Sequence, residues 1–350
     1  MINELGGEFW ELETAQEKKP IEQKPHKLLL TGRTSLDYIL RDIKLLNNTV
    51  VAYLPSYCCH TMIKPFIDNG VEVDFYNIYF ENGRFIYDLD FNTKCNIVLI
   101  MQYFGFYHEA VGQTIRVLRD NEKIVIEDAT HSWFSESPYS YNSNYIYASF
   151  RKWTGLPCGS IAIKQNGQYL FHPPTETNHE YIRLRQVAAL TKKLYIEKGF
   201  GNKEKYLGLF KQAEELLEHD YSGYCLPEKY SDMLYKMDTR RIIRQRKENA
   251  KALIEGLKNI SGLETIATSK QDVPLFVPIM VLHGQRERLR QYLIKNEIYC
   301  PVHWPLSQAH KISNKYLYEN SLSLVCDQRY SLSDMNRILS VITHFFRKEA

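Results

Sequence analysis

Two neighbouring apolar runs each end in a side chain that can do chemistry. The first, Ile124-Val-Ile-Glu-Asp128, ends in acid, and the second leads from Tyr147 through Ser149 to Lys152 and a turn rich in Gly and Pro. Short continuous apolar runs are typical of strands covered on both faces. In parallel sheets the carboxyl ends of the strands lie at one edge, where ligands bind. A strand ending in Asp beside a strand ending in Ser-x-x-Lys therefore restricts the chain to few folds.

This pair of residues is what a site for pyridoxal phosphate (PLP) requires. Lys152 is predicted to form a Schiff base with the cofactor aldehyde, and Asp128 to hold the proton on its pyridine nitrogen. Ser149 is expected to donate its hydroxyl to the cofactor phosphate. Lys152 must lose its proton to act as a nucleophile, so it should be desolvated, with a lowered pKa. The alternatives are a surface lysine, a buried serine bonded to the backbone, and an aspartate that caps the next helix.

Two residues beside Asp128 have different expected roles. His131 is expected to hydrogen-bond the carboxylate or the cofactor's ring oxygen, or to pack against Trp133. Glu127 points to the opposite face of the strand and is expected to be structural. His131 is therefore a candidate cofactor-binding residue, whereas Glu127 is not.

The segment Gly32-Arg33-Thr34 opens a predicted helix directly after a strand. Free backbone N–H groups at a helix start bind anions, and Gly allows close approach, so these residues are the predicted phosphate cradle. The next strand leads into Pro55–His60, where Tyr57 or His60 is a candidate to stack on the cofactor ring. The adjacent Cys58 and Cys59 are interpreted as buried thiols rather than a metal or redox site.

Apolar runs alternate with helical patterns through the first half of the chain, which predicts parallel strands with right-handed crossovers. The sequence indicates an N-terminal arm over residues 1–27, a large cofactor-binding domain over 28–235 and a small α+β domain over 236–350. A last helix is expected from Ser331, with Asp334 three residues on as a capping box.

Composition excludes several classes of partner. Lys and Arg together number 44 against 41 for Asp and Glu, so no global charge favours nucleic acid or an anionic membrane. No run of about 18 apolar residues occurs in the sequence, so no membrane span is predicted. The N-terminus does not have the pattern of a signal peptide, so a cytoplasmic location is expected. The seven cysteines are expected to be reduced and mostly buried, and no metal site is predicted.

Several motifs in this order resemble the DegT/DnrJ/EryC1/StrS family of PLP-dependent sugar aminotransferases, as a divergent member. The matching segments are Gly32-Arg-Thr-Ser-Leu36, Leu54-Pro-Ser-Tyr57, Gln102-Tyr-Phe-Gly105, Val125-Ile-Glu-Asp-Ala-Thr-His131, Lys152 with Gly159, Tyr299-Cys-Pro-Val-His-Trp-Pro305 and Leu322-Ser-Leu-Val-Cys-Asp-Gln-Arg-Tyr330. The resemblance covers most of the chain, and the segment that ends at His131 is the most specific match.

The resemblance implies fold type I of PLP enzymes: a large domain with a mostly parallel seven-stranded sheet, a small C-terminal domain, and a homodimer with the site at the interface. It implies a transaminase that takes an amino group from an amino acid, usually glutamate. The acceptor would be a keto sugar carried on a nucleotide, for polysaccharide or amino-sugar synthesis. Lys152 would also move the proton in the reaction, and its presence disfavours the family's dehydratase branch, which has His there.

Three departures separate this chain from the family pattern. The spacing from Ser149 to Lys152 is two residues shorter, Ser160 replaces the second Gly, and the ring-stacking register falls on Cys59. Because a thiol cannot stack as an aromatic ring does, these departures bear on the substrate more than on the cofactor.

Candidates for substrate anions are Arg151, His303 and Arg329, with surface or structural roles as the alternative. Two rival functions stay open: elimination or decarboxylation of an amino acid with the same cofactor, and a degenerate, non-enzymatic member of the fold.

Overall fold

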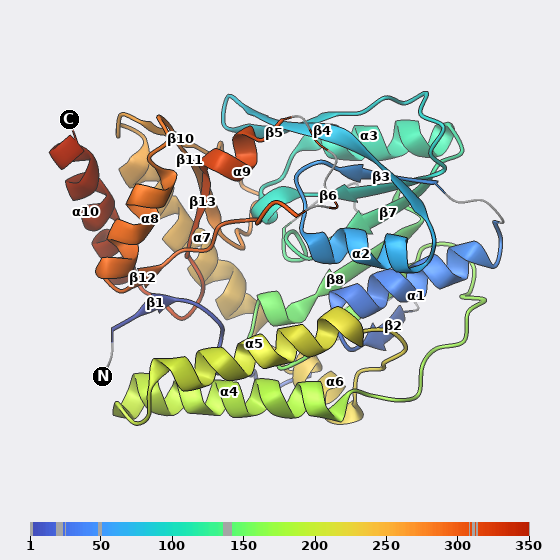
Figure 1. The fold of residues 1–350 in the computed structure, drawn as a ribbon, viewed down its shortest axis with the longest axis horizontal. Coiled ribbons are helices and arrows are strands. Elements are labelled where there is room, and N and C mark those ends of the chain that lie inside the picture. The colour runs from blue at the N-terminus through green and yellow to red at the C-terminus, as the bar shows by residue number, and fades with distance from the viewer. Residues whose placement is uncertain are drawn as a thin grey trace. The chain divides into compact units, whose positions relative to one another are not determined.

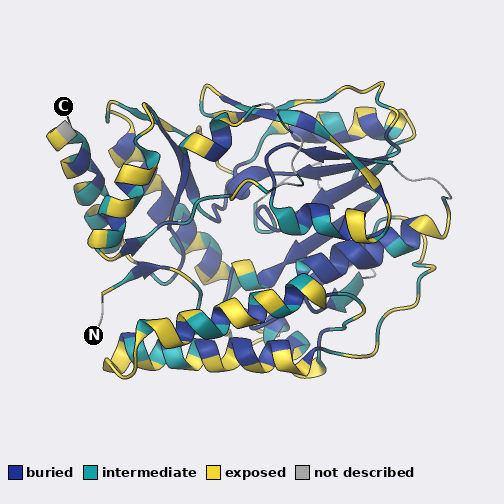
Figure 2. Ribbon diagram, in the orientation of Figure 1, coloured by how far each residue is buried: buried dark blue, intermediate teal, exposed yellow. Residues whose placement is uncertain are grey.

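The apolar run Ile97–Met101 forms strand β6, and every residue in it is buried (Figure 2). It pairs in parallel with β3 (Val51–Pro55) on one side and β7 (Ile124–Asp128) on the other. Central parallel strands are covered on both faces, which explains the unbroken apolar sequence. The computed structural model describes residues 3–18, 24, 26–47, 51–135, 142–307, 309, 312 and 314–349.

The chain divides into two compact units, which are described separately. Unit 1 consists of Met1–Glu4, Glu8–Thr49 and Asn144–Asp238, and unit 2 of Leu5–Gly7, Val50–Ser143 and Thr239–Ala350. Each unit is thus assembled from segments far apart in the sequence. The domain boundary predicted near residue 235 stays a prediction.

Unit 1 combines three antiparallel strands with four helices. The strand order is β2-β9-β8, with Ser149 of β8 opposite Ser160 of β9. The elements are β2 (His26–Leu29), α1 (Gly32–Lys44), β8 (Tyr145–Ser149), the 3-10 turn η3 (Phe150–Lys152), β9 (Ser160–Lys164), α4 (His179–Lys198), α5 (Lys203–His219) and α6 (Glu228–Tyr235). Helices α4 and α5 lie side by side as a hairpin (Figure 1). Helix α4 ends at Gly199, which has a positive φ of 65°. Glycine adopts that conformation without steric cost, so it ends α4 there.

Unit 2 holds the mostly parallel strands. Its main-sheet order is β7-β6-β3-β4-β5, in which only the β4–β5 pair is antiparallel. The elements of this part are β3, β6 and β7 with α2 (His60–Asp68), β4 (Glu72–Glu81), β5 (Arg84–Asp88), the 3-10 turn η1 (Tyr103–Gly105) and α3 (Glu109–Asp120).

The C-terminal part of unit 2 is a smaller α+β assembly around an antiparallel sheet of order β10-β11-β13. Helices α7 and α10 pack on one another, and α8 packs on α10 (Figure 1). The elements are α7 (Thr239–Leu257), β10 (Leu263–Thr265), β11 (Val277–Val281), α8 (Arg286–Lys295), β12 (Ile298–Tyr299), α9 (Tyr316–Asn320), β13 (Ser321–Leu324) and α10 (Leu332–Glu349), with β1 (Leu5–Gly6) paired to β12.

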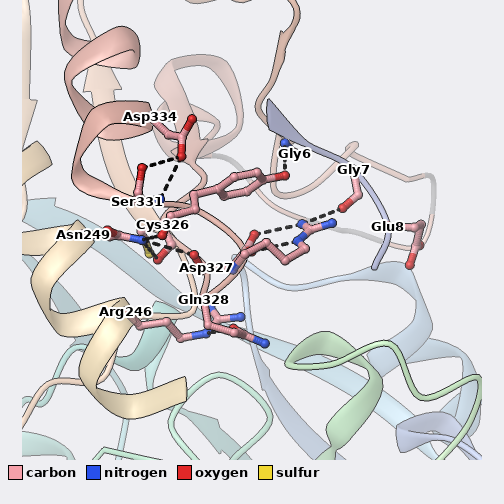
Figure 3. Close-up of polar contacts among 12 residues, drawn as sticks. Gly6, Gly7, Glu8, Arg246, Asn249, Cys326, Asp327, Gln328, Ser331 and Asp334 are labelled. Carbon is pink, nitrogen blue, oxygen red and sulfur yellow. Dashed lines mark hydrogen bonds and ion pairs between the residues drawn. The ribbon is translucent and has the colours of Figure 1, made fainter. Parts of the chain in front are cut away.

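The predicted start of the last helix is confirmed. The Asp334 carboxylate accepts hydrogen bonds at 2.8 Å from both the backbone N–H and the hydroxyl of Ser331 (Figure 3). Ser331 donates both bonds, so Asp334 satisfies the backbone N–H at the N-cap, which is one half of the predicted capping box. Among the described residues, no helix is both long and apolar enough to cross a membrane.

The expected α/β fold with a mostly parallel sheet is confirmed, but the expected count of seven strands is wrong. In the described residues, unit 2 contributes five main-sheet strands and unit 1 three. The extra strand is β5, which forms a hairpin with β4 through Asn82 and Gly83, whose φ values are 52° and 73°. An Asn-Gly turn with two positive φ angles is a strong hairpin signal, because its twist matches that of the strands.

Candidate active site

Lys152 lies at the end of a short turn that begins as soon as β8 ends. Ser149 is the N-cap of the 3-10 turn η3 and Lys152 is its last residue. Ser149 keeps extended backbone angles, so it and Lys152 stand at the two ends of this turn. The turn is fixed from within unit 1, since Phe150 N–H donates to the Gly159 carbonyl at 2.9 Å. Lys152 is exposed, which differs from the expected desolvation.

Gly32 lies directly against Ser149. A Cβ built on Gly32 would be 3.2 Å from Cβ and 3.8 Å from Oγ of Ser149. Gly32 is the first residue of α1, after the N-cap Thr31. The backbone N–H groups of a first turn have no partner within their own helix. Helix start, serine hydroxyl and lysine are thus gathered in unit 1, a donor set that fits a phosphate group beside an amine.

The side chains of Arg33 and Thr34 are engaged elsewhere in unit 1. Arg33 is buried, donates to the Leu217 carbonyl, and forms an ion pair with Glu218 at 3.1 Å. The Thr34 hydroxyl donates to the Tyr221 carbonyl at 2.7 Å. These contacts fasten α1 to the end of α5. The Thr34 N–H donates to the Thr31 hydroxyl oxygen at 3.3 Å, so the backbone N–H groups nearer the helix start are what this turn can offer a phosphate. The cofactor role of Arg33 and Thr34 stays a prediction.

Ser160, which stands where the family pattern has Gly, has a structural contact. Its buried hydroxyl is 2.7 Å from the hydroxyl of Ser35 and donates to the Leu29 carbonyl at 3.2 Å. The serine at this position therefore links β9 to α1 and β2 and does not add a polar group to the predicted phosphate cradle.

Asp128 is the last residue of β7 and is buried in unit 2. Its Oδ1 accepts a hydrogen bond at 2.8 Å from the Thr130 N–H. This local turn fixes the carboxylate at the carboxyl end of a parallel strand, the position at which open α/β sheets bind ligands.

His131 is buried beside it, and its Nδ1 accepts a hydrogen bond at 3.2 Å from the Phe104 N–H. In the neutral imidazole the proton is then on Nε2. The imidazole stacks on the indole of Trp304, with centroids 5.7 Å apart and an interplanar angle of 22°. His131 thus packs against Trp304 and Phe104, and its expected packing against Trp133 stays a prediction.

Glu127 is fully buried on the same strand, and Ser143 donates to its Oε2 at 3.2 Å. Burial raises the pKa of Glu127 to about 8, despite the lowering effect of hydrogen bonds from Ser143 and Gln102. The carboxyl is therefore mostly neutral at pH 7, in keeping with the structural role expected for it.

Tyr57 lies in a polar and aromatic contact network of unit 2. It is 1% exposed; its hydroxyl donates to the His303 carbonyl and lies 2.8 Å from the Ser321 hydroxyl. Its ring packs against those of Tyr103 and Trp304. Both ends of Tyr57 are thus fixed by neighbours within the unit.

The other residues expected near the cofactor ring make weaker contacts. Cys59 is partly exposed, and its sulfur accepts a hydrogen bond from Thr61 at 3.2 Å. His60 Nδ1 lies 3.4 Å from the Ser307 hydroxyl. All seven cysteines are free and five are buried, as expected, but Cys59, which was expected to be buried with Cys58, is partly exposed. No cluster of three or more possible metal ligands occurs in the part of the chain that the structure describes.

The three predicted substrate residues all have partners. Arg151 forms an ion pair with Glu214 at 2.8 Å. His303 Nδ1 lies 2.8 Å from the Ser323 hydroxyl. Arg329 forms two contacts of 2.8 Å with Asp327 and donates to the Gly7 carbonyl at 3.1 Å (Figure 3). A substrate anion would therefore have to share each of them with its present partner.

Sequence reasoning missed two sets of residues. Phe104 and Trp304 lie in motifs that were identified, yet their stacking with His131 unites loops far apart in the sequence. Glu8 and Arg185 form an ion pair near Lys152 in unit 1 and carry no sequence motif at all. A buried arginine inside a helix becomes informative only when its partner is known.

Comparisons with known proteins agree on the fold. No family model matches the chain, and no curated protein matches it. Among solved structures it is similar to the putative sugar aminotransferase Spr1654 from Streptococcus pneumoniae in its PLP form, with a TM-score of 0.67, 15% identity, and 97% and 93% of the two chains covered. It is also similar to DesV of S. venezuelae, with a TM-score of 0.65, 14% identity, and 93% and 86% covered.

A DegT DnrJ EryC1 StrS aminotransferase from Brucella abortus matches with a TM-score of 0.64 and 14% identity, covering 92% of this chain and 86% of its own. Identities this low are informative about architecture. The chain has the fold shared by these sugar aminotransferases.

Proposed function

We propose that this chain is a PLP-dependent aminotransferase that transfers an amino group from an amino acid, glutamate in the first instance, to a keto sugar carried on a nucleotide. The donor leaves as its keto acid, and the acceptor carbonyl becomes an amine. The observation that carries the proposal is the grouping of Gly32, Ser149 and Lys152 at one turn. A homodimer and a cytoplasmic location are part of the same proposal.

The residues present fit the cofactor. The first turn of α1 at Gly32 and the Ser149 hydroxyl would bind its phosphate, and Lys152 would hold it covalently. Asp128, at the end of β7, would hold the proton of the pyridine nitrogen. His131, with its proton on Nε2, would donate to the ring oxygen.

PLP, when bound, supplies an electron sink for the carbanion that forms beside the amino group. Lys152 would take the proton from that carbon and return it one position further along, which requires an amine that can be both neutral and protonated. The carboxylate of Asp128 would keep the pyridine nitrogen protonated throughout. Ser149 and the start of α1 would keep the phosphate in place while Lys152 is released.

The test is the absorbance spectrum of the purified protein with PLP, before and after borohydride. A yellow band that borohydride fixes covalently on the wild type, but not on Lys152→Ala, would support the proposal. The matched control is Lys205→Ala, which removes another exposed lysine of unit 1.

Added glutamate should then bleach the band, and a keto sugar on a nucleotide should restore it. A protein that binds no cofactor would overturn the enzyme reading in favour of a degenerate member of the fold. Bleaching by another amino acid alone, with turnover in the absence of any keto acceptor, would favour elimination or decarboxylation.

A further inference from the structure

A cluster of charged groups lies close to Lys152 within unit 1. Arg185 of α4 forms ion pairs with Glu8 at 2.9 Å and Glu214 at 3.4 Å, and Arg151 of η3 forms one with Glu214 at 2.8 Å. The side chains of Arg185 and Arg151 are 4% and 11% exposed, whereas those of Glu8 and Glu214 are 38% and 36% exposed. Two nearly buried arginines are thus balanced by two carboxylates that still reach water.

The N-terminal segment brings Glu8 to this place by packing on the loop after Lys152. Gly155 N–H donates to the Glu11 carbonyl at 3.1 Å. A Cβ on Gly155 would lie 2.3 Å from that same oxygen, so only glycine permits so close an approach. Lys192 donates to the Glu8 carbonyl at 2.7 Å and fixes the segment on α4.

The carboxylates are coupled electrostatically to Lys152. Burial alone would raise the pKa of Glu8, but the charges of Arg185, Arg151 and Lys152 hold it well below its usual range. Glu214 follows the same pattern: burial opposes ionisation, and Arg151, Arg185 and Lys152 lower its pKa. Since electrostatic interactions are reciprocal, each carboxylate also stabilises the protonated form of Lys152.

We propose that Glu8 and Glu214 are positioning residues for Lys152, held by buried arginines so that the charge beside its amine is balanced. Without them Lys152 would face two arginine cations alone. The amine of Lys152 would then lose its proton readily. It would also be a weak base, and so would take up a proton poorly in the reaction. The inference deepens the proposed function, on which its catalytic meaning rests.

The charged groups of the cluster come from four separate segments of unit 1. Glu8 comes from the N-terminal segment, Arg151 from η3, Arg185 from α4 and Glu214 from α5. Tyr181 of α4 also belongs to it and stays neutral, since burial raises its pKa to about 12. Removing either carboxylate leaves an excess of positive charge, so the pKa of Lys152 must fall.

The test measures Lys152 directly in the full chain without added cofactor. Trace labelling with acetic anhydride between pH 6 and 11, followed by peptide mass spectrometry, gives the apparent pKa of Lys152. Glu8→Gln and Glu214→Gln should each lower it by about 0.5 to 1 unit, the size expected for one charge in a partly solvated cluster. Glu8→Asp should restore most of the shift.

The matched control is Glu11→Gln. Glu11 lies on the same segment, but its side chain is 52% exposed and forms an ion pair with Lys193. A shift in Glu8→Gln and Glu214→Gln no larger than that in Glu11→Gln would overturn the proposal. If Glu8→Gln detaches the segment and unfolds, as thermal denaturation would show, Glu214→Gln decides the question from α5.

A second readout separates this inference from the proposed function. In protein loaded with PLP, the pH midpoint of the yellow band should move in the same direction in both variants. A wild type that binds no PLP would refute the proposed function, while the labelling result would still stand or fall by itself. Unchanged labelling in a protein that does bind PLP would refute only the role of the carboxylates.

Discussion

The side chain of Ser149 lies against the α-carbon of Gly32, so close that a methyl group on Gly32 would be 3.2 Å from Cβ of Ser149. This contact brings the start of α1 to the end of β8 and defines where a phosphate could be held. It also predicts how the position responds to substitution.

Gly32→Ala should weaken PLP binding about tenfold, because the new methyl would lie 3.8 Å from the Ser149 hydroxyl and occupy space that the phosphate needs; that factor corresponds to about 1.4 kcal/mol. Ala is favoured over Gly in helices by up to about 1 kcal/mol, but its methyl would be only 3.2 Å from Cβ of Ser149, so the free energy of unfolding is measured alongside the affinity. Titration of the yellow band against PLP concentration measures the affinity. Gly208→Ala in α5, with open space around its Cβ, is the control.

Arg33→Ala should destabilise the protein by roughly 2–3 kcal/mol and leave PLP affinity nearly unchanged, because the guanidinium binds Leu217 and Glu218. Urea denaturation and PLP titration together check this. Lys44→Ala, at an exposed position of the same helix, should change the free energy of unfolding by no more than about 0.5 kcal/mol. A large loss of PLP affinity with normal stability would instead show that Arg33 binds the phosphate.

Tyr57→Phe should lower the free energy of unfolding by roughly 1–3 kcal/mol. The substitution removes a buried hydroxyl that donates to the His303 carbonyl and is hydrogen-bonded with the Ser321 hydroxyl. The measurement is the midpoint of chemical denaturation. Tyr224→Phe is matched in chemistry, but the hydroxyl of Tyr224 donates to Asp220 at the surface, so it should have little effect. Equal effects of the two substitutions would contradict the buried network.

Glu127 makes stability depend on pH. Burial raises its pKa from an ordinary value of 4.5 to about 8 in the folded protein, so protonation favours the folded state. The stabilisation is complete below about pH 4.5 and is lost as pH rises through 8, by roughly 3–5 kcal/mol in all. Glu127→Gln cannot titrate at this position. From pH 5 through 7 to 8.5, the urea midpoint of the wild type should therefore fall relative to that of the variant. Urea midpoints that change with pH in the same way in both proteins would disprove this prediction.

Asp128→Asn should keep the fold, because the amide oxygen can still accept the Thr130 N–H. Transamination should fall by at least about 100-fold, since an amide does not hold a proton on the pyridine nitrogen. Single-turnover bleaching by glutamate measures the loss, and circular dichroism checks the fold. Activity within a few fold of the wild type would exclude Asp128 as the ring partner.

The sequence predicted what depends on local pattern. The apolar run of β6, the strand that ends at Asp128 and the capping box at Ser331 were all read correctly, because periodicity and capping act over a few residues. The β4–β5 hairpin was not predicted, although the pair Asn82-Gly83 is a sequence signal for such a turn.

The side-chain partners of Arg33 could not be predicted, because Leu217 and Glu218 are more than 180 residues away in the chain. The same holds for the stacking of Trp304 on His131. Such pairs are determined by tertiary packing, which a single sequence does not display.

The contact between Glu8 and Arg185 spans 177 residues, and this has a consequence for biosynthesis. At about 5–20 residues per second, a ribosome needs roughly 10–35 s after making Glu8 before Arg185 exists. During that interval Glu8 has no arginine of α4 with which to form its ion pair. The surroundings of Lys152 are therefore completed late, only once the α4–α5 hairpin has been translated and folded.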